Sequence, residues 1–120
     1  MWVNAIEHIQ LAMPAGQEDA ARRFYADLLE IPEVPKPPEL AKRGGAWFEH
    51  GRLKIHLGVD PDFKPARKAH PGLLVQNLDT LVLKLRAAGV EIVEAEPLPE
   101  WRHVYISDPF GNRIELMEPR

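Results

Sequence analysis

Four residues of metal-ligand type occupy matching places in the two halves of this sequence. His8 and His56 lie in the first half, and His70 and Glu115 lie in the second. His56 follows His8 by 48 residues, and Glu115 follows His70 by 45. Imidazole nitrogens and carboxylate oxygens bind divalent ions such as zinc, nickel, manganese, iron and cobalt. Because a duplicated unit puts equivalent residues on equivalent strands, the spacing predicts that these four residues form one divalent-metal site.

The immediate neighbours of His56 and Glu115 predict where these two side chains point. Each lies between an isoleucine and a leucine, in Ile55-His56-Leu57 and in Ile114-Glu115-Leu116. Alternate side chains of a strand face opposite ways, so the apolar neighbours would face the core and the two polar side chains the other surface. With His8 and His70, this set would leave two positions of an octahedron for water or a chelating substrate.

Each half must fold as one βαβββ unit to place these residues. In the first half, alternation predicts a strand over Val3–Met13, and an apolar stripe predicts a helix over Gln17–Ile31. A rigid surface connection, Pro35–Pro38, follows the helix, because proline lacks an N–H donor. A hairpin is then predicted from the strands Ala46–Glu49 and Leu53–Val59.

The second half repeats this plan. The sequence predicts a strand over His70–Val75 and then a helix with Asp79 as its N-cap, which ends at Gly89. A short strand at Glu91–Glu94 is followed by a hairpin, whose strands are His103–Ser107 and Arg113–Met117. We therefore expect an α+β domain over residues 1–120, with one module over about 1–60 and the other over about 66–120. The mixed sheets of the two modules are expected to curl into an open barrel-like cavity.

Composition narrows the classes of function. The 120 residues are 45% hydrophobic and carry a formal net charge of −3, which argues against general nucleic-acid binding. No apolar stretch approaches the length of a membrane span, and the start of the chain lacks the pattern of a signal peptide. The absence of cysteine excludes thiolate ligands and disulfides. We expect a cytoplasmic protein that binds neither membranes nor nucleic acid.

Three segments resemble the vicinal oxygen chelate superfamily, which includes glyoxalase I, bleomycin-resistance proteins, fosfomycin-resistance thiol transferases, methylmalonyl-CoA epimerase and extradiol dioxygenases. They are Ile6–Ile9, Arg23–Leu29 and Asp108–Leu116. The resemblance covers essentially the whole chain. It implies metal ligands on the first and last strands of each module, at the positions of His8, His56, His70 and Glu115. It also implies a homodimer in which both subunits contribute to each site, and pairing within or between chains stays open.

His56 is the position that departs from the family patterns. Glyoxalase I usually has glutamate there, and the epimerase has a residue more like glutamine. In extradiol dioxygenases and fosfomycin enzymes only the other three positions bind metal. By that resemblance His8, His70 and Glu115 would form a 2-His-1-carboxylate triad that leaves sites open for iron and oxygen, so an extradiol-dioxygenase-like enzyme is an alternative to the functions below.

The resemblance leaves three functions open. The first is a metal-dependent, glyoxalase-like lyase or isomerase that chelates a small substrate through vicinal oxygens, with Glu115 as the catalytic base. The second is a thiol transferase, for which an anionic substrate would need basic side chains; the candidates are Lys42, Arg43, Arg67, Arg102 and Arg113. The third is a non-catalytic drug or metabolite binder with an aromatic cavity, drawn from Trp47, Phe48, Trp101 and Tyr105. The expected substrate contacts are His103, Tyr105, Arg113 and Trp47.

Overall fold

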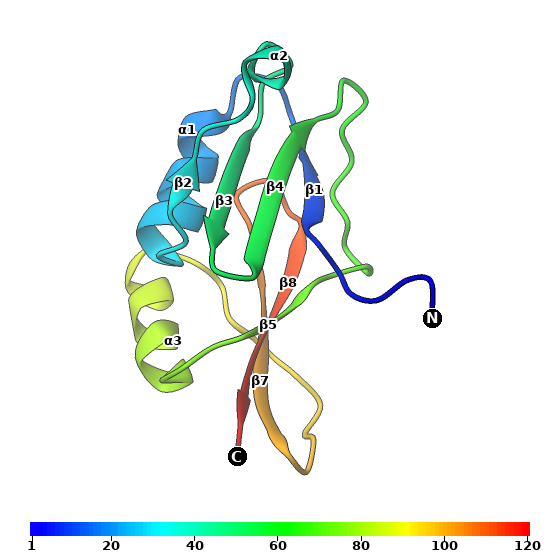
Figure 1. The fold of residues 1–120 in the computed structure, drawn as a ribbon. Helices are drawn as coiled ribbons and strands as arrows, with labels where there is room; N and C mark the ends of the chain where they lie inside the picture. The colour runs from blue at the N-terminus through cyan, green and yellow to red at the C-terminus, as the bar shows by residue number, and fades with distance from the viewer. The chain divides into compact units, whose positions relative to one another are not determined.

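Both halves of the chain fold with the predicted βαβββ topology. The computed structural model describes all 120 residues, as two units over Met1–Lys64 and Pro65–Arg120 (Figure 1). Each unit holds one open four-stranded mixed sheet, with strand order β1-β4-β3-β2 in the first and β5-β8-β7-β6 in the second. Because the two orders are equivalent along the chain, the expected α+β class built from two repeated modules is confirmed. That the chain is one domain stays a prediction.

The first unit contains four strands and three short helical segments. The strand β1 pairs in parallel with β4, and the remaining neighbours pair antiparallel. The α-helix α1 continues directly into the π-helix η1. The helix α2 begins at Pro38, and proline is tolerated at this place because the N–H of a first helical residue has no partner within the helix. The elements are β1 Ile9–Met13, α1 Glu18–Ala21, η1 Arg22–Leu28, β2 Glu33–Val34, α2 Pro38–Ala41, β3 Ala46–His50 and β4 Leu53–Val59.

The second unit repeats this arrangement with one helix. The strand β5 pairs in parallel with β8, which pairs antiparallel with β7, and β7 with β6. The helix α3 is the longest in the chain, and no helix combines the length and the apolar character that a membrane crossing requires. The elements are β5 Gly72–Leu74, α3 Leu78–Ala87, β6 Val93–Glu94, β7 Trp101–Ser107 and β8 Arg113–Pro119.

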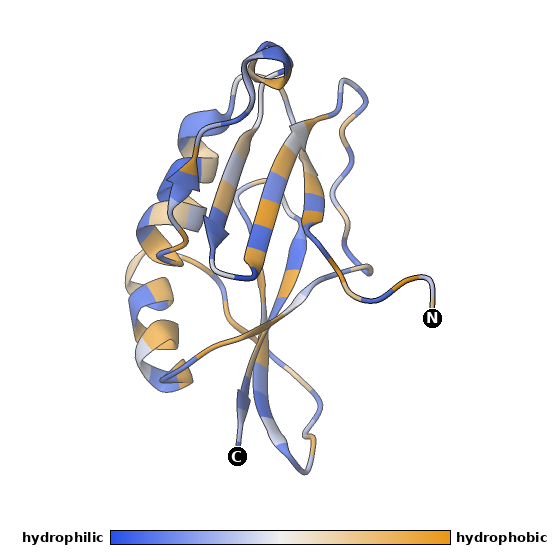
Figure 2. Cartoon of the chain, viewed as in Figure 1, coloured by the Kyte–Doolittle hydropathy of each residue, from blue (hydrophilic) through white to orange (hydrophobic).

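Strand alternation gives each unit an apolar core, and Figure 2 shows hydrophobic and hydrophilic residues alternating along β4 and β8. In the first unit, Phe48 is fully buried and stacks on Tyr25 of η1, with 5.3 Å between the ring centroids. In the second unit, Ile114 and Leu116 are buried, as is Leu85 of α3. The prediction that the neighbours of His56 and Glu115 lie in the core is therefore correct.

Several predicted boundaries are wrong. The first strand begins at Ile9 and the strand of the second half at Gly72, so His8 and His70 each precede their strand by a short distance. Asp79 is not the N-cap of α3; Asn77 holds that place with a left-handed φ of 55°. The carboxylate of Glu118 accepts a hydrogen bond from the Leu78 N–H at 3.0 Å, and so serves the helix end from β8. The first helix ends at Leu28 rather than at Ile31.

Candidate functional site

The sheet registers place the four predicted ligands at equivalent positions. In the first unit, His56 of β4 pairs with Gln10 of β1, two residues after His8. In the second, Glu115 of β8 pairs with Gly72 of β5, which is also two residues after its histidine, His70. Each unit therefore carries one residue just before its first strand and one in the middle of its last strand, on neighbouring strands of one sheet.

In the second unit, His70 and Glu115 meet directly. His70 Nε2 lies 3.0 Å from Glu115 Oε1, although the two residues are far apart in sequence. The other ring nitrogen, Nδ1, donates to the Lys68 carbonyl oxygen at 2.9 Å. Glu115 is 9% exposed, and the His70 side chain is 25% exposed. The pair is thus partly shielded and still reachable from solvent.

The partners of His70 favour a cation at this point. A neutral imidazole has one N–H, and the Lys68 carbonyl can only accept, so Nδ1 carries that hydrogen. The Nε2 lone pair of a neutral ring would then face the Glu115 carboxylate at 3.0 Å. Two electron-rich atoms at this distance need a proton or a metal ion between them. A backbone carbonyl that fixes the second nitrogen is also the usual support of a metal-binding histidine.

His103 is the second partner of Glu115, and we expected it only as a substrate contact. Its Nδ1 lies 2.6 Å from Glu115 Oε2, and its Nε2 faces the Glu96 carbonyl oxygen at 2.6 Å. Burial raises the pKa of Glu115, but the hydrogen bonds with His103 and His70 outweigh this, and the pKa lies below its ordinary value. Glu115 therefore stays a carboxylate at neutral pH.

The register of the β7–β8 hairpin could have identified His103 as a neighbour of Glu115 from the sequence. Tyr105 pairs with Glu115 across β7 and β8, so His103 stands diagonally beside Glu115 on the same face. Diagonal side chains of this kind lie within reach of one another when they are long. Counting back from the predicted turn would have placed this histidine against the carboxylate.

In the first unit, the rings of Trp47 and His8 stack on the ring of His56. The Trp47 and His56 rings are nearly parallel, at 2° with centroids 3.9 Å apart, and His8 stacks on His56 at 4.4 Å. The His56 side chain is 5% exposed, whereas that of His8 is 43% exposed. Trp47 lies on the same sheet face as His56, while Phe48 is in the core. The structure therefore brings together His8 and His56, the two predicted ligands of this unit.

Glu49 holds one nitrogen of His56. His56 Nε2 lies 2.7 Å from Glu49 Oε2, and the sequence reading did not include Glu49 in the site. A carboxylate that accepts from a histidine fixes the orientation of the ring and leaves the lone pair on the other nitrogen. Glu49 is the diagonal neighbour of His56 across β3 and β4, so the signal was again the hairpin register.

The structure shows two pairs of possible metal ligands, one pair in each unit, and no complete metal site. No group of three or more His, Asp or Glu side chains is arranged to hold a metal ion. His8 with His56, and His70 with Glu115, each supply two donors of the type that first-row divalent metals bind. The four-residue site stays a prediction.

A cavity of about 630 Å³ opens beside His70 and Glu115 in the second unit. Its lining includes His70, His103, Tyr105, Arg113 and Glu115, so three of the four expected substrate contacts lie here. Tyr105 meets His70 edge-on, with centroids 5.3 Å apart. Trp47, the fourth expected contact, belongs to the first unit.

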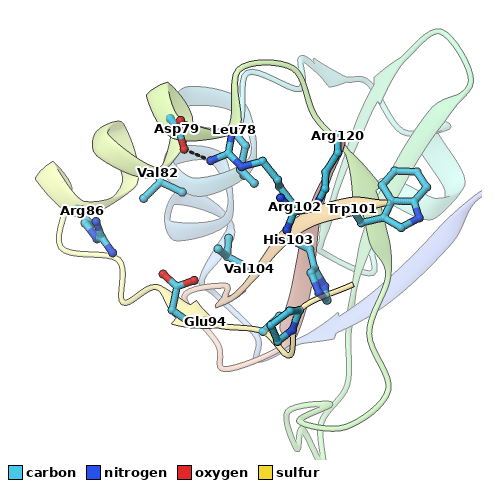
Figure 3. A pocket seen from close by; sticks show the side chains of 12 residues that line it. Leu78, Asp79, Val82, Arg86, Glu94, Trp101, Arg102, His103, Val104 and Arg120 are labelled. Carbon is cyan, nitrogen blue, oxygen red and sulfur yellow. Dashed lines mark hydrogen bonds and ion pairs between the residues drawn. The ribbon is translucent and has the colours of Figure 1, made fainter. Parts of the chain in front are cut away.

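Another cavity of the second unit, about 320 Å³, lies against α3 (Figure 3). Arg102 reaches toward the helix and is bound by Asp79, and Glu118 lies 3.5 Å from it on the other side. Because its cation is already neutralised, Arg102 is poorly placed to bind an anionic substrate.

The model of the Glyoxalase/Bleomycin resistance protein/Dioxygenase superfamily matches residues 5–116. The chain belongs to this superfamily. A crystal structure of a protein assigned to the glyoxalase family from Bacillus anthracis is 43% identical, with a TM-score of 0.95 and coverage of 100% of this chain and 98% of that chain. No match was found among curated proteins.

More distant structures share the fold alone. A glyoxalase/dioxygenase from Nostoc punctiforme is 22% identical, with a TM-score of 0.77 and coverage of 98% of this chain and 99% of that one. The fosfomycin resistance protein FosX from Listeria monocytogenes is 18% identical, with a TM-score of 0.76 and coverage of 97% and 93%. The name of the superfamily covers glyoxalases, bleomycin resistance proteins and dioxygenases, and the reaction of this chain follows from none of these similarities.

Proposed function

We propose that this protein is a metal-dependent, glyoxalase-like lyase or isomerase that acts on a small substrate with two vicinal oxygens. The observation that carries the proposal is the pair of His70 Nε2 and Glu115 Oε1, 3.0 Å apart with the other nitrogen of His70 held by a carbonyl. His70 and Glu115 would hold the ion together with His8 and His56. A bound divalent ion would polarise substrate oxygens and stabilise an oxyanion.

The chain's own residues would handle the proton. Glu115 is a carboxylate with two imidazole partners, so it can take a proton from a substrate carbon and pass it on within the same site. His103 holds Oε2 at 2.6 Å and thereby fixes the direction in which the carboxylate presents its oxygens. The cavity beside these residues would position the substrate and exclude part of the water.

Glu49 favours a second candidate, a dioxygenase-like site with three ligands. Since His56 Nε2 is held by Glu49 at 2.7 Å, His56 could orient its neighbours without binding the ion. His8, His70 and Glu115 would then be the ligands. The drug-binding alternative has less support, because the Trp47 ring is already covered by His56.

Metal analysis of protein purified without chelators tests these proposals. We expect stoichiometric metal in the native protein and its loss in His70→Ala and Glu115→Gln. His50→Ala is the matched control, since His50 is exposed at the end of β3. Loss of metal in His56→Ala favours the four-ligand enzyme, and retention favours the three-ligand site. Native protein with no more metal than His70→Ala would refute both.

Turnover then separates the reactions. The native protein loaded with zinc, nickel, manganese or iron is assayed with a hemithioacetal, an epoxide and a catechol. Sedimentation of the same samples tests the homodimer that we propose with this function.

A further inference from the structure

A third cavity of the second unit is lined by two arginines and no carboxylate. It measures about 410 Å³ and is lined by Arg67, Val93, Tyr105, Ile106, Ser107, Gly111 and Arg113. Neither arginine forms an ion pair, in contrast to Arg102 with its two acidic neighbours. Unpaired guanidinium groups at the wall of a cavity provide forked donors for a carboxylate or a phosphate.

The backbone places these two arginines side by side. The Arg113 N–H donates to the Ala66 carbonyl at 2.8 Å, and the Ala66 N–H donates to Asn112 Oδ1 at 3.0 Å. Asn112 is 1% exposed, so this connection is buried. Arg67 directly follows Ala66, so its backbone lies next to that of Arg113, and both arginines line the cavity.

Tyr105 orients Arg113. The guanidinium carbon of Arg113 lies 3.7 Å from the centroid of the Tyr105 ring, a cation–π contact that leaves the N–H groups at the edge free to donate. Ser107 pairs with Arg113 across β7 and β8, so its hydroxyl lies on the same face of the sheet. The arginine is thus held in place without any anion to neutralise it.

This cavity adjoins the one beside Glu115, because Tyr105 and Arg113 line both. Arg113 and Glu115 lie on the same face of β8, two residues apart, which is about 7 Å along a strand. Glu115 and Arg113 therefore line adjoining cavities on one face of β8. A single small molecule can span that distance.

We propose that the substrate carries an anionic oxygen group, a carboxylate or a phosphate, which Arg113 and Arg67 bind in the cavity that adjoins Glu115. This assignment rests on the proposed function, in which Glu115 holds the metal ion and acts as the base. It narrows the substrate class to small acids or phosphate esters that carry this group together with the vicinal oxygens.

The test uses metal-free protein, so that anions cannot bind through the metal. Sodium phosphate and sodium acetate are titrated separately at constant ionic strength, and the arginine Nε–H signals are followed by NMR. We expect a saturable shift of the Arg113 signal with at least one of the two anions, and sodium chloride as a reference should give none. Affinity should fall by about tenfold or more in Arg113→Gln and in Arg67→Gln.

Matched variants keep the test falsifiable. Arg23→Gln, an exposed arginine of the first unit, should leave the affinity unchanged. Tyr105→Phe keeps the ring and should bind nearly as well as the native protein, whereas Tyr105→Leu should bind more weakly. Shifts that grow linearly with both anions, or an equal loss in Arg23→Gln, would overturn the proposal. Saturable binding in protein that never takes up metal would leave the anion site in place while the proposed function fails.

Discussion

Replacing Glu115 with glutamine tests whether the contacts of this carboxylate stabilise the metal-free protein. Glu115 is 9% exposed and bonds His103 at 2.6 Å and His70 at 3.0 Å. Hydrogen bonds to a charged group contribute ~1.5–3 kcal/mol each, and neutral ones ~0.5–1.5. Glutamine keeps the shape and can bond both rings as a neutral group. We therefore expect Glu115→Gln to lower the free energy of unfolding by about 1–3 kcal/mol at pH 7.

The same variant has a defined pH dependence. The two histidines hold the pKa of Glu115 below its ordinary value despite burial. A carboxyl with a lowered folded-state pKa contributes stability that is complete above its unfolded pKa, about 4.3, and that disappears as the pH falls through the folded-state pKa. The difference in stability between native protein and Glu115→Gln should therefore be largest near neutral pH and shrink below about pH 4.

Urea unfolding in the presence of a chelator provides the measurement, with circular dichroism as the probe at several pH values. Glu91→Gln serves as the control, because Glu91 is an exposed carboxylate of the same unit. If the stability difference for Glu115→Gln stayed constant from pH 7 into the acid range, or if Glu91→Gln showed the same loss, the described role of the carboxylate would be wrong.

Four further substitutions, one of them a comparison at Gly16, test the elements that carry the site, each by urea unfolding. Gly45→Ala should lower the free energy of unfolding by roughly 3 kcal/mol or more, because φ is +84° and the new Cβ would lie 2.1 Å from a carbonyl oxygen of β4. Gly16→Ala should lower it by only about 1–2 kcal/mol, because φ is +78° but the new Cβ would meet open space. Glu118→Ala should cost about 0.5–2 kcal/mol, since it removes the acceptor for the Leu78 N–H at the start of α3, and an unchanged stability would refute that capping role. Leu85→Ala should cost about 2–5 kcal/mol because Leu85 is fully buried, and a cost below that of Gly16→Ala would contradict its place in the core.

The strands around Glu115 could be predicted closely because a local turn fixes them. Asp108 Oδ1 accepts hydrogen bonds from the Phe110 and Asn112 N–H groups, both at 2.9 Å. Such a side-chain turn depends on nearby residues alone, so it is visible in the sequence. It sets Ser107 opposite Arg113, and the face of every later residue of the hairpin follows from that pair.

The predicted starts of the parallel strands were wrong because pairing decides them. Pro71 has no N–H to give to a ladder, and its carbonyl instead accepts from the Glu115 N–H at 3.0 Å, so β5 begins only at Gly72. The alternation of Val3–Met13 extends beyond the part of the strand that finds a partner in β4. The predicted N-cap of α3 was wrong for the same kind of reason. The acceptor for the Leu78 N–H at the start of α3 is Glu118, which lies forty residues away in the sequence.

His56 and Glu49 depend on each other, which bears on the departure of this chain from the glyoxalase I pattern. A glutamate at position 56 would put a second carboxylate where His56 now lies, with Glu49 Oε2 at 2.7 Å from the ring. Two like charges about 4 Å apart cost about 4 kcal/mol at a partly buried site. We expect His56→Glu to lose about 2–4 kcal/mol of stability at pH 7, and Glu49→Gln in the same chain to recover a large part of it. Equal stability of the single and the double variant in urea would show that the pair is not coupled. If the coupling is present, a glutamate at position 56 is stable in this chain only when the charge of Glu49 is also removed.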